Sequence, residues 1–549
     1  MGVLTLFSLP NLTLAAAVEA LVVIKIYGGS SARLFETTSH LGTVAIILLA
    51  NYVLWVVVWV FLYPRLFSPL KNLRGPRAII SPSSQRLFVT NRPTGDLFLD
   101  LVKKYPGEEM LNLSAFDTSV LVTKPRMLAD LLTHKAYDFV KPLNGSGFLR
   151  QVLGDGLVVT EGDQHKFLRK NTMPAFSFRH IKNLYPIMWE KAELMTTLLR
   201  REVLLESSSK QTSKPSKVVE IGGWVSRATL DIIGVAGLGR DFATLTNAED
   251  PLKAVYNQLL DPSPEKIVFA VLCLLFGVPF VRLIPWRMNK VFADLTSQLN
   301  EICMPMLRDK KEAIARGNDH VDILSLLLKS GNFTDHQLKD QLLTFLAAGH
   351  ETTSSALTWS CYLLAKYPES QEKLRAEICE ALPAEINDPS ELGDILEQLP
   401  YLNGVINETL RLYPTVPTTV REAIRDTELC GQTIPKGVVV VLSIWQMNRS
   451  PELWGAGAGE FRPERWVTAG KPNTNGGAGS NYEFMTFLHG PRSCIGQGFA
   501  RAEMRCLLAS MIRTFRWDGA MGDKPVIPRG VITIRPSHGM NLKLQPLAP

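Results

Sequence analysis

The distribution of apolar residues divides the chain into a hydrophobic N-terminal stretch and a longer part in which apolar and polar positions alternate. Residues 41–63 contain no charged side chain. At about 1.5 Å per residue, such a run can cross a hydrocarbon core of about 30 Å. Trp55, Trp59 and Tyr63 lie at or near its C-terminal end, where aromatic rings favour the membrane interface. We therefore predict that residues 1–64 form a membrane anchor with one transmembrane span at 41–63.

Basic residues and prolines follow this run without an intervening acid. Positive charge beside a span favours the cytosolic side, so everything after residue 64 is expected to face the cytosol. The prolines predict that residues 65–77 form a stiff hinge. An earlier apolar segment, residues 12–24, carries Glu19 and leaves open a second span, an interfacial segment or a signal-like segment. The basic residues are Arg65, Lys71, Arg74 and Arg77, and the prolines are Pro64, Pro69 and Pro76.

Beyond the hinge, apolar residues recur mostly with the period of an α-helix. Strand-like runs are fewer, at Leu121–Thr123, Gly437–Leu442 and Gly530–Ile534. We therefore predict one catalytic domain over residues 78–549, mainly α with small β-sheets. The helical periods cover Asp96–Tyr105, Asp163–Arg169, Tyr185–Leu205, Phe292–Arg316, Asp335–Leu364, Glu369–Ala381, Tyr401–Leu412 and Gln497–Thr514.

The segment Ile267–Val281 is apolar except for one thiol, and Gly277 and Pro279 interrupt it. It is too short to span a bilayer. Two interpretations remain open. The segment is either a buried helix or a surface loop that dips into the bilayer and lets an apolar substrate enter from lipid.

Composition excludes several classes of protein. With 46% hydrophobic residues, most of the 549-residue chain cannot be disordered. A mean hydropathy of +0.07 argues against a transporter with many spans. A net charge of +7 fits a membrane surface or an acidic protein partner better than a nucleic acid. The seven cysteines are an odd number, so they cannot all be paired in disulfides.

The strongest candidate site is the segment Phe487–Gly496, F-L-H-G-P-R-S-C-I-G, which precedes a predicted helix. A thiolate at Cys494 would be stabilised by the N–H groups at the start of that helix and by the helix dipole. Gly490 and Gly496 allow the backbone to fold around the sulfur and to approach a flat, bulky group. Arg492 is placed for an anionic group. The alternative is a buried structural cysteine.

This segment resembles the heme-binding loop of the cytochromes P-450, F-x-x-G-x-R-x-C-x-G, at every specified position. The resemblance implies the cytochrome P-450 fold and a heme b cofactor, with Cys494 as the axial thiolate ligand of the iron. It also implies that Arg492 contacts a heme propionate. Phe487, Gly490 and Gly496 would shape the loop around the heme.

Two further segments agree with this resemblance. Glu408 and Arg411 are three residues apart on a predicted helix and share one face, although this pair alone is a weak motif. Arg465 lies in the segment P-E-R-W at residues 463–466. The resemblance implies that the three residues form a Glu–Arg–Arg network beneath the heme. A partly buried carboxylate shared by two guanidiniums is satisfied, and removal of any one member leaves an unpaired charge.

Residues 348–353, A-G-H-E-T-T, lie in the longest predicted helix and resemble the oxygen-binding segment of the family. The resemblance implies that Ala348 and Gly349 leave room for dioxygen. It implies that Thr352 hydrogen-bonds the dioxygen or its water, and that Glu351 helps relay protons from solvent.

The same helix contains the beginning of a zinc-protease pattern, H-E-x-x-H, at His350 and Glu351. That pattern needs a second histidine at position 354, where Ser354 stands instead. None of the other histidines forms a usable ligand cluster in the sequence. The zinc interpretation therefore fails.

Three more residues resemble the propionate ligands of the family. Arg421 lies in the loop after the E-x-x-R helix, where the family has a basic residue. The segment Gly162–Arg169 resembles the W-x-x-x-R helix of the family, but His165 stands where tryptophan is more usual. An imidazole can still donate to a carboxylate, so His165 and Arg169 are both expected to bind a propionate.

The implied activity is insertion of one oxygen atom of O2 into a hydrophobic small molecule, with the other atom released as water. The sequence has no G-x-G-x-x-G segment after a strand, so NADPH would act through a separate protein. We expect the NADPH-cytochrome P-450 reductase of the endoplasmic reticulum membrane, with cytochrome b5 as a further candidate donor and the catalytic domain in the cytosol. Arg501 and Arg505 are placed to meet the acidic surface of the reductase.

The same resemblance implies a substrate pocket of mostly apolar and threonine side chains, which predicts a hydrophobic substrate. The anchor and the segment A-G-H-E-T-T-S-S resemble those of filamentous-fungal enzymes that modify terpenoids or polyketides in secondary metabolism. The pocket residues would come from Asp138–Val159, Phe345, Ala348, Thr415–Val420 and Gly530–Ile534.

Two alternative functions use the same cofactor. One is a heme-thiolate isomerase or lyase that needs neither O2 nor a reductase. The other is a non-catalytic membrane-anchored heme binder. The presence of both Glu351 and Thr352 favours a monooxygenase over either alternative.

Overall fold

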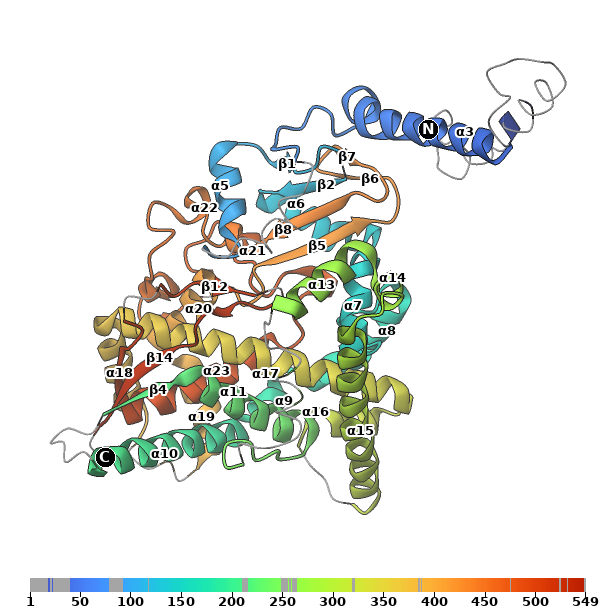
Figure 1. Ribbon diagram of the computed structural model, residues 1–549. Helices are drawn as coiled ribbons and strands as arrows, with labels where there is room; N and C mark the ends of the chain where they lie inside the picture. Colours follow the sequence, from blue (N-terminus) through green and yellow to red (C-terminus); the bar gives the residue numbers. More distant parts are fainter. Residues whose placement is uncertain are drawn as a thin grey trace.

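A computed structural model describes residues 18–19, 22, 40–78, 92–116, 118–209, 216–247, 255, 258, 264–317, 321–383, 386, 388–473, 475–522, 525–530 and 532–547. These residues form a mainly helical molecule with small sheets, which confirms the predicted fold class. The helix α17 (Asp335–Lys366) crosses the middle of the molecule, and the other helices and the sheets are arranged around it (Figure 1).

The helix α17 is the longest of the described helices and begins at a capping box. The Thr334 hydroxyl accepts the N–H of Gln337, and the Gln337 side chain accepts the N–H of Thr334 at 2.9 Å. These reciprocal bonds satisfy two donors that a helix start leaves unpaired. Most of its later side chains are buried, including the polar Thr353 and Ser355, because other elements cover the helix on several sides. A helix covered in this way can hold polar side chains inside the molecule.

The largest apolar core forms where α11 (Ile221–Ile232), α20 (Pro400–Leu412) and α23 (Gln497–Thr514) pack around α17, and α10 (Tyr185–Ser209) packs on α11 and α23. Removal of this apolar surface from water is the main contribution to stability. Apart from α3, η1, α13 and α14, which are described below, the other described helices and helical turns are α5 (Asp96–Lys104), α6 (Pro125–Ala129), η2 (Asp130–His134), η3 (Ala136–Asp138), α7 (Leu143–Leu153), α8 (Gly162–Thr172), η4 (Met173–Phe176), α9 (Phe178–Lys182), η5 (Ile233–Gly237), α15 (Arg287–Ala315), α16 (Ile323–Ser330), α18 (Pro368–Ala381), η6 (Pro389–Glu391), α19 (Leu392–Gln398), α21 (Ile444–Met447), α22 (Pro451–Trp454), η7 (Pro463–Trp466), η8 (Asn481–Glu483) and η9 (Gly490–Arg492).

The largest sheet has the strand order β1-β2-β8-β5-β3 and lies above α17 in the view of Figure 1. Strand β2 runs parallel to β8, with Val120 opposite Val440, and the other neighbours are antiparallel. A second sheet has the order β11-β14-β4, and three two-stranded pairs complete the β-structure among the described residues. The strands are β1 (Met110–Asn112), β2 (Ser119–Val122), β3 (Phe139–Val140), β4 (Lys217–Glu220), β5 (Thr418–Ala423), β6 (Thr427–Leu429), β7 (Gln432–Ile434), β8 (Val439–Ser443), β9 (Val467–Thr468), β10 (Lys471–Pro472), β11 (Phe515–Gly519), β12 (Pro528–Arg529), β13 (Arg535–Pro536) and β14 (Asn541–Pro546).

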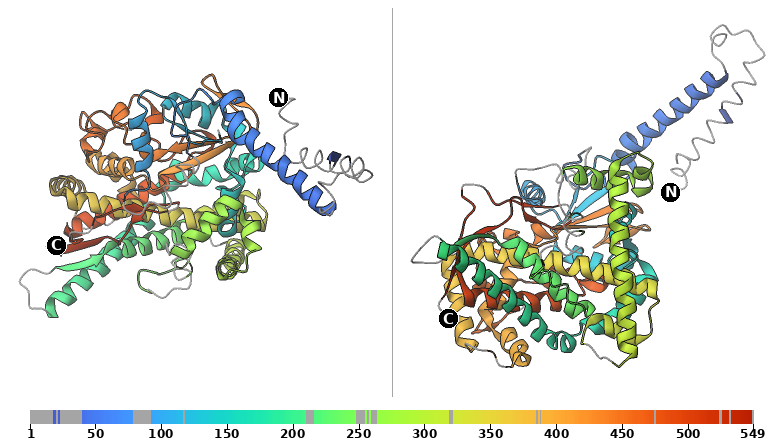
Figure 2. Two further views of the ribbon diagram at one scale, coloured as in Figure 1. Left: turned by 45° about the horizontal axis from the view of Figure 1, so that its top comes forward. Right: turned by 60° about the horizontal axis from the view of Figure 1, so that its bottom comes forward.

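The N-terminal helix α3 (His40–Val56) continues into the π-helical segment η1 (Val57–Phe67) and projects away from the rest of the molecule (Figure 2). Within the described part of the chain, no helix combines the length and the apolar character needed to cross a membrane. The structure therefore does not support the predicted span at 41–63 as one such helix. Most of the alternative segment 12–24 lies outside the described residues.

The segment predicted as a hinge is attached to the first strand of the large sheet. The N–H of Asn112 donates to the carbonyl of Arg74 at 2.8 Å, and the N–H of Ala78 donates to the carbonyl of Leu113 at 3.1 Å. A Cβ at Gly75 would lie 2.0 Å from the carbonyl oxygen of Asn112, so the glycine allows this close approach. These contacts fix where the chain enters the catalytic domain.

The eight predicted helices are all present, with α23 at the predicted bounds. The strand predicted at Gly530–Ile534 is wrong, because this segment connects β12 to β13. A Cβ at Gly530 would lie 1.6 Å from the carbonyl oxygen of Thr533, so the chain folds back on itself here. The apolar residues Ile532 and Ile534 lie outside both strands, although their alternating spacing resembles that of a strand.

The apolar segment Ile267–Val281 forms most of α13 (Pro264–Phe276) and α14 (Val278–Arg282). One face is buried, and the Phe269 ring stacks on Phe292 of α15 with centroids 4.7 Å apart. The other face exposes apolar side chains that include Phe276 and Phe280. The buried-helix interpretation therefore holds for one face, and the contact with lipid stays a prediction for the other.

Candidate active site

A cavity of about 350 Å³ lies between α17, β5 and the loop that precedes α23. Its wall along α17 is formed by small, apolar and threonine side chains, and basic side chains gather at another part of the wall. Cys494 lines the cavity on the side of the loop. The structure thus brings together the loop, the central helix and the basic residues, which lie far apart in the sequence.

The loop that carries Cys494 is shaped by a backbone hydrogen bond and a glycine. The N–H of Cys494 donates to the carbonyl of Phe487 at 2.8 Å. Gly490 has a φ of 75°, and a Cβ there would lie 2.0 Å from the carbonyl oxygen of Leu132. Any other residue would force the backbone apart at this point. Gly496 is the N-cap residue of α23 and lines the cavity.

Cys494 is the only one of the seven cysteines whose side chain lines the cavity. Its thiol is open to the cavity, and the cavity itself lies inside the protein. Burial raises the pKa of the Cys494 thiol, and the N–H of Gly496 and the guanidiniums of Arg169 and Arg501 partly offset this effect. These groups favour the thiolate, and a cation bound in the cavity would favour it further.

Five basic side chains from separate segments line the cavity. Among the described residues, Glu161 is the carboxylate that pairs with them: its Oε1 lies 3.3 Å from Lys141 Nζ, and its Oε2 forms an ion pair with Arg492. One carboxylate cannot neutralise this group, so this part of the cavity has an excess of positive charge. The five residues, which we call the cation cluster, are Lys141 after β3, His165 and Arg169 on α8, Arg421 on β5 and Arg492 in η9.

The pKa values in the cation cluster reflect this excess. Burial, with a contribution from Arg421, lowers the pKa of Lys141 to about 8. Burial, with a contribution from Arg492, lowers the pKa of His165 to about 4. Burial also lowers the pKa of Arg421 to about 10. The buried atoms His165 Nδ1 and Arg492 Nε have no hydrogen-bond partner among the described residues. An anionic ligand would supply the missing acceptors and charge.

On α17, Ala348, Gly349 and Thr352 line the cavity, whereas Glu351 does not. The Thr352 hydroxyl donates to the carbonyl of Ala348 at 2.8 Å. A Cβ at Gly349 would lie 2.9 Å from the Ile233 side chain, so this glycine also allows η5 to pack closely on α17. The Glu351 carboxylate is buried and turned to a different set of partners, which come from the segment between β12 and β13 and from β13 itself.

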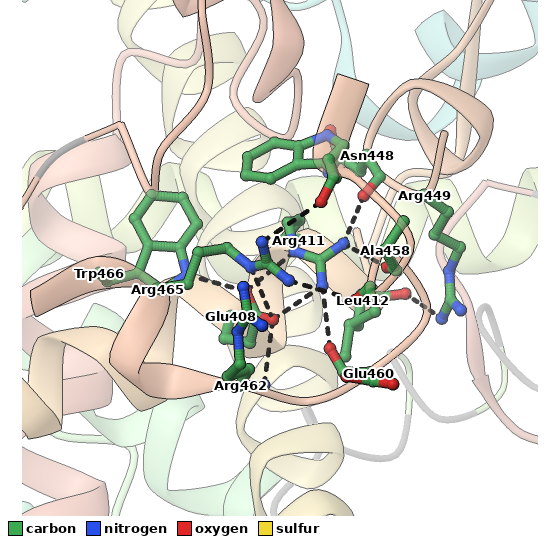
Figure 3. A network of polar contacts seen from close by, with 12 residues as sticks. Glu408, Arg411, Leu412, Asn448, Arg449, Ala458, Glu460, Arg462, Arg465 and Trp466 are labelled. Atoms are coloured by element: carbon green, nitrogen blue, oxygen red, sulfur yellow. Dashed lines mark hydrogen bonds and ion pairs between the residues drawn. The ribbon is translucent and has the colours of Figure 1, made fainter. Parts of the chain in front are cut away.

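Glu408, Arg411 and Arg465 meet in a buried network (Figure 3). Arg411 donates from Nε to Glu408 Oε2 at 2.9 Å and from Nη2 to Oε1 at 2.7 Å. Arg465 Nε lies 3.4 Å from Oε1, and Trp466 Nε1 donates to Oε2 at 2.8 Å. The N–H of Arg462 is a further donor to Oε1 at 3.1 Å. This set of donors compensates for the burial of the Glu408 carboxylate.

The remaining hydrogen bonds of Arg411 go to backbone carbonyls. Its Nη1 donates to Asn448 at 2.7 Å and to Ala458 at 2.6 Å, and its Nη2 donates to Glu460 at 3.1 Å. The network therefore ties α20 to the long connection between β8 and η7 (Figure 3).

The structure corrects the expectation that Gly530–Ile534 contributes to the wall of the cavity. The cavity includes Phe345 and Thr415, but no described residue of Gly530–Ile534 lines it. The reason is that the N–H of Ile534 is bonded to Thr415 at 2.9 Å and its carbonyl accepts from Ser355, so this segment packs behind the wall.

Arg501 and Arg505, expected at the surface that meets a reductase, are largely withdrawn from it. The guanidinium of Arg501 lies 5.2 Å from the centroid of the Phe487 ring, and burial lowers the pKa of Arg501 to about 10. Arg505 donates to Asn403 at 2.8 Å and to the Tyr185 hydroxyl at 2.9 Å. These contacts hold α23 against its neighbours rather than presenting two cations to a partner.

Sequence reasoning missed three residues of the site. Lys141 belongs to the cation cluster, Glu161 is its carboxylate partner, and Trp466 donates to Glu408. Trp466 follows directly after Arg465 in the segment P-E-R-W, so its position was a usable signal. Lys141 and Glu161 stand in no motif, and only the folded chain brings the residue after β3 and the N-cap of α8 together with Arg492 of η9.

Comparison with known proteins agrees with this geometry. A sequence profile described as Cytochrome P450 matches residues 87–543. The chain is 39% identical over 527 residues to the cytochrome P450 monooxygenase sphH of Aspergillus fumigatus, with 93% of this chain and 94% of that protein covered. It is 34% identical to the cytochrome P450 monooxygenase ALT8 of Alternaria alternata, with 97% and 99% covered, and 35% identical to FUM15 of Gibberella moniliformis, with 91% and 92% covered.

The profile covers most of the chain, and the relatives are aligned over almost their whole length. Cytochrome P450 monooxygenases hold a heme whose iron is bound by a thiolate, receive electrons from NADPH through a reductase, and incorporate oxygen into organic molecules. This chain belongs to the cytochrome P450 family.

Proposed function

We propose that the chain is a membrane-attached monooxygenase in which Cys494 binds the heme iron and a neutral, hydrophobic small molecule is oxidised. The observation that carries this proposal is the position of Cys494, the one cysteine open to the cavity. It faces the same cavity as Thr352 and the cation cluster. A thiol, a hydroxyl and a surplus of cations around one apolar space are what a heme with two propionates and an oxidation site require.

The donors around the cavity fit a heme. Heme is flat and apolar except for its two propionates, and the unpaired His165 Nδ1 and Arg492 Nε could donate to such carboxylates. Lys141, Arg169 and Arg421 would add positive charge. When bound, the heme would supply the iron centre that activates O2 for transfer of one oxygen atom.

The residues of α17 would manage protons beside that centre. Thr352 Oγ1 holds its proton at the cavity wall, in a hydrogen bond to the Ala348 carbonyl. A ligand in the cavity can accept this hydrogen bond after a rotation of the Thr352 side chain. Glu351 directly precedes Thr352 on α17 and would exchange protons with solvent on the other side. Glu408, Arg411 and Arg465 would support the heme-binding region from below, without contact to the reactants.

The lining supports a substrate without charge. Away from the cation cluster, the wall consists mostly of apolar side chains and threonines, with Ser493 and Cys494 on the loop, and no carboxylate is among the lining residues that are described. Hydrophobic burial would therefore supply most of the binding free energy. We propose a terpenoid or a polyketide of secondary metabolism as the substrate. The apolar residues and threonines include Leu157, Ile233, Phe345, Thr415, Val416 and Ile444.

Exposed apolar side chains support attachment to the membrane of the endoplasmic reticulum. On α3, Ile46 is 57% and Leu49 is 62% exposed, and α14 adds Phe280 at 52%. Large apolar side chains exposed together mark contact with lipid or a partner. The basic flank at Arg65 would keep the catalytic domain on the cytosolic side.

Electrons would come from the NADPH-cytochrome P450 reductase, with cytochrome b5 as a second donor. Arg501 and Arg505 do not serve as docking residues in this proposal. Exposed Lys166 and Lys170 on α8 and Arg179 on α9 remain as cations for an acidic partner.

One expression experiment tests the proposal. The chain and its Cys494→Ala variant are produced with the reductase, and membranes are assayed for the long-wavelength absorption band of a thiolate-ligated heme with CO. The parent chain should show the band, and Cys494→Ala should lose it. With NADPH and a panel of terpenoids and polyketides, the parent should yield products that are one oxygen atom heavier. Survival of the band in Cys494→Ala would overturn the assignment of the ligand. A chain without residues 1–64 that stays fully in the membrane fraction would overturn the N-terminal anchor.

A further inference from the structure

Glu351 is held by two residues at the end of the chain. The Thr533 hydroxyl donates to Glu351 Oε1 at 2.7 Å, and the Arg535 guanidinium forms an ion pair with Glu351 Oε2. Glu351 is 5% exposed, whereas the Arg535 side chain is 40% exposed. The carboxylate is therefore buried, and its charged partner reaches the solvent.

The segment that supplies these two residues is also attached to the cavity wall. Ser355, one helical turn after Glu351 on α17, donates from its hydroxyl to the carbonyl of Ile534. The N–H of Ile534 donates to the carbonyl of Thr415 at 2.9 Å, and Thr415 lines the cavity. The β12–β13 hairpin is thus joined to α17 at two residues and to the opposite wall at one. Its position and the position of Glu351 depend on each other.

Few other charges act on this site among the described residues. His350, the neighbour of Glu351 on α17, is neutral, because burial, with Arg535 as a minor contributor, lowers its pKa to about 4. Glu220, at the start of α11, is the carboxylate that attracts Arg535 from another element. A buried carboxylate beside one guanidinium stays ionised mainly because of that guanidinium. Loss of the cation would favour the protonated acid.

We infer that Arg535 and Thr533 are positioning residues for the reaction proposed above: they keep Glu351 ionised and hold its carboxylate at the solvent side of α17. This inference rests on the proposed function only in the proton-transfer role given to Glu351 and Thr352. Thr352 faces the cavity and Glu351 faces Arg535, so the two adjacent side chains lie between the reaction space and the exposed guanidinium. The β12–β13 hairpin thereby determines the protonation state of Glu351.

The test compares two arginines that face each other across one hairpin. Arg529 on β12 is opposite Arg535 on β13, and no ion pair is found for it in the described part of the chain. Arg535→Gln removes the guanidinium next to Glu351, Arg535→Lys keeps a positive charge there, and Arg529→Gln is the matched control. The infrared spectrum of each heme-loaded protein is recorded across pH and compared with the same protein carrying Glu351→Gln. The difference between the two reports the protonation of Glu351 without turnover.

In the parent protein, Glu351 should contribute carboxylate bands at neutral pH. In Arg535→Gln, the pH at which Glu351 gains its proton should rise by about one to three units, as expected when an adjacent opposite charge is lost. Arg535→Lys should restore most of the parent behaviour, and Arg529→Gln should leave it unchanged. Thr533→Val, which removes only the neutral donor, should move the protonation in the same direction by less. It keeps the test available if Arg535→Gln does not fold.

An unchanged protonation of Glu351 in both Arg535→Gln and Thr533→Val would overturn the inference. An equal shift in Arg529→Gln would do the same, because it would show a general effect of charge. The pH profile of NADPH consumption with the reductase should move together with the infrared midpoint. The thiolate band with CO separates the two proposals. If the thiolate band with CO is normal but the infrared midpoint does not shift, only the positioning role of Arg535 and Thr533 is contradicted. If the thiolate band is missing, the proposed function is contradicted, and the infrared result on Glu351 remains valid.

Discussion

Two buried ionic clusters in the described part of the chain, the Glu408 network and the cation cluster, differ in whether they are complete. Around Glu408, one carboxylate receives hydrogen bonds from two guanidiniums, an indole and a backbone N–H, and its side chain has no exposure to solvent (Figure 3). In the cation cluster, Glu161 is the one carboxylate against four cations and a histidine, and the buried His165 Nδ1 and Arg492 Nε have no partner among the described residues.

This difference indicates that the Glu408 network supports the fold, whereas the cation cluster is suited to bind a ligand. A complete cluster is stable by itself and gains nothing from a ligand, so its function is to hold α20 and the connection to η7 together. An incomplete cluster destabilises the ligand-free chain, because buried donors and charges lack partners. When an anion binds and accepts their hydrogen bonds, removal of this free-energy penalty contributes to the binding free energy. The same residue types therefore serve stability in one place and, by our proposal, heme binding in the other.

The largest effect should come from breaking the complete cluster. Glu408→Gln leaves Arg411 with no counter-ion in a fully buried place, and we expect a loss of about 3–5 kcal/mol in the free energy of unfolding. Urea unfolding, or the yield of protein with a thiolate-ligated heme if little folds, measures the loss.

The chain offers a matched control on α18, where Glu372 and Arg375 have the same spacing but Glu372 is 51% exposed. Glu372→Gln should cost about 0–1 kcal/mol, as other surface ion pairs do. If Glu408→Gln and Glu372→Gln lowered the free energy of unfolding by similar amounts, burial would not be what makes the Glu408 network important for stability.

A smaller effect is expected when a residue of the cation cluster is replaced, and it should appear as faster loss of heme. Arg421 is buried and, among the described residues, donates only to Thr419 and to the backbone carbonyl of Val420. Arg421→Met therefore should not weaken the heme-free chain. It should speed heme transfer to an acceptor protein by roughly 10-fold to 100-fold, the equivalent of one charge-assisted hydrogen bond.

Arg425→Met provides the control for that measurement, because Arg425 follows shortly after β5 but is exposed and paired with Asp138. Its heme transfer rate should equal that of the parent chain. A strong destabilisation of the heme-free Arg421→Met chain, with no change in heme transfer, would place Arg421 among the structural residues.

The smallest effect is a pH dependence from His165. Burial holds the pKa of His165 at about 4, below its ordinary value of 6.5. As the pH falls through this range, the unfolded chain binds a proton before the folded chain does, so the stability of the heme-free chain should fall. Below about 4 both states are protonated and this contribution stops changing. Bound propionates would favour the imidazolium and should weaken the dependence.

Thermal unfolding across this pH range, with and without heme, measures the effect. His165→Gln should make the stability of the heme-free chain less dependent on pH, whereas His538→Gln, at an exposed position, should not. An identical pH dependence in the parent and His165→Gln would show that His165 does not titrate as a neutral buried group.

The fold was largely predictable because helices depend on neighbouring residues. The period of 3.6 located α17 and α23 well, and the local pattern around Cys494 indicated both the loop and the helix that follows. The segment Gly530–Ile534 was misjudged because a turn can contain the same apolar residues as a strand. The position of Glu351 among Thr533 and Arg535 was not predictable, because it depends on a contact between residues 184 apart in the chain.

The sequence by itself determined the family resemblance, the main helices and the cysteine loop, since each of these depends on residues close together along the chain. Only the tertiary structure decided which of the two E-x-x-R pairs on helices is buried, because Glu372 and Glu408 have the same local spacing but differ in how far other elements cover them. It also decided that Lys141 belongs to the cation cluster, that Glu161 pairs with it, and that Arg501 and Arg505 are withdrawn from the surface. Charge acts through space and depends on burial, so these outcomes follow from how distant segments meet.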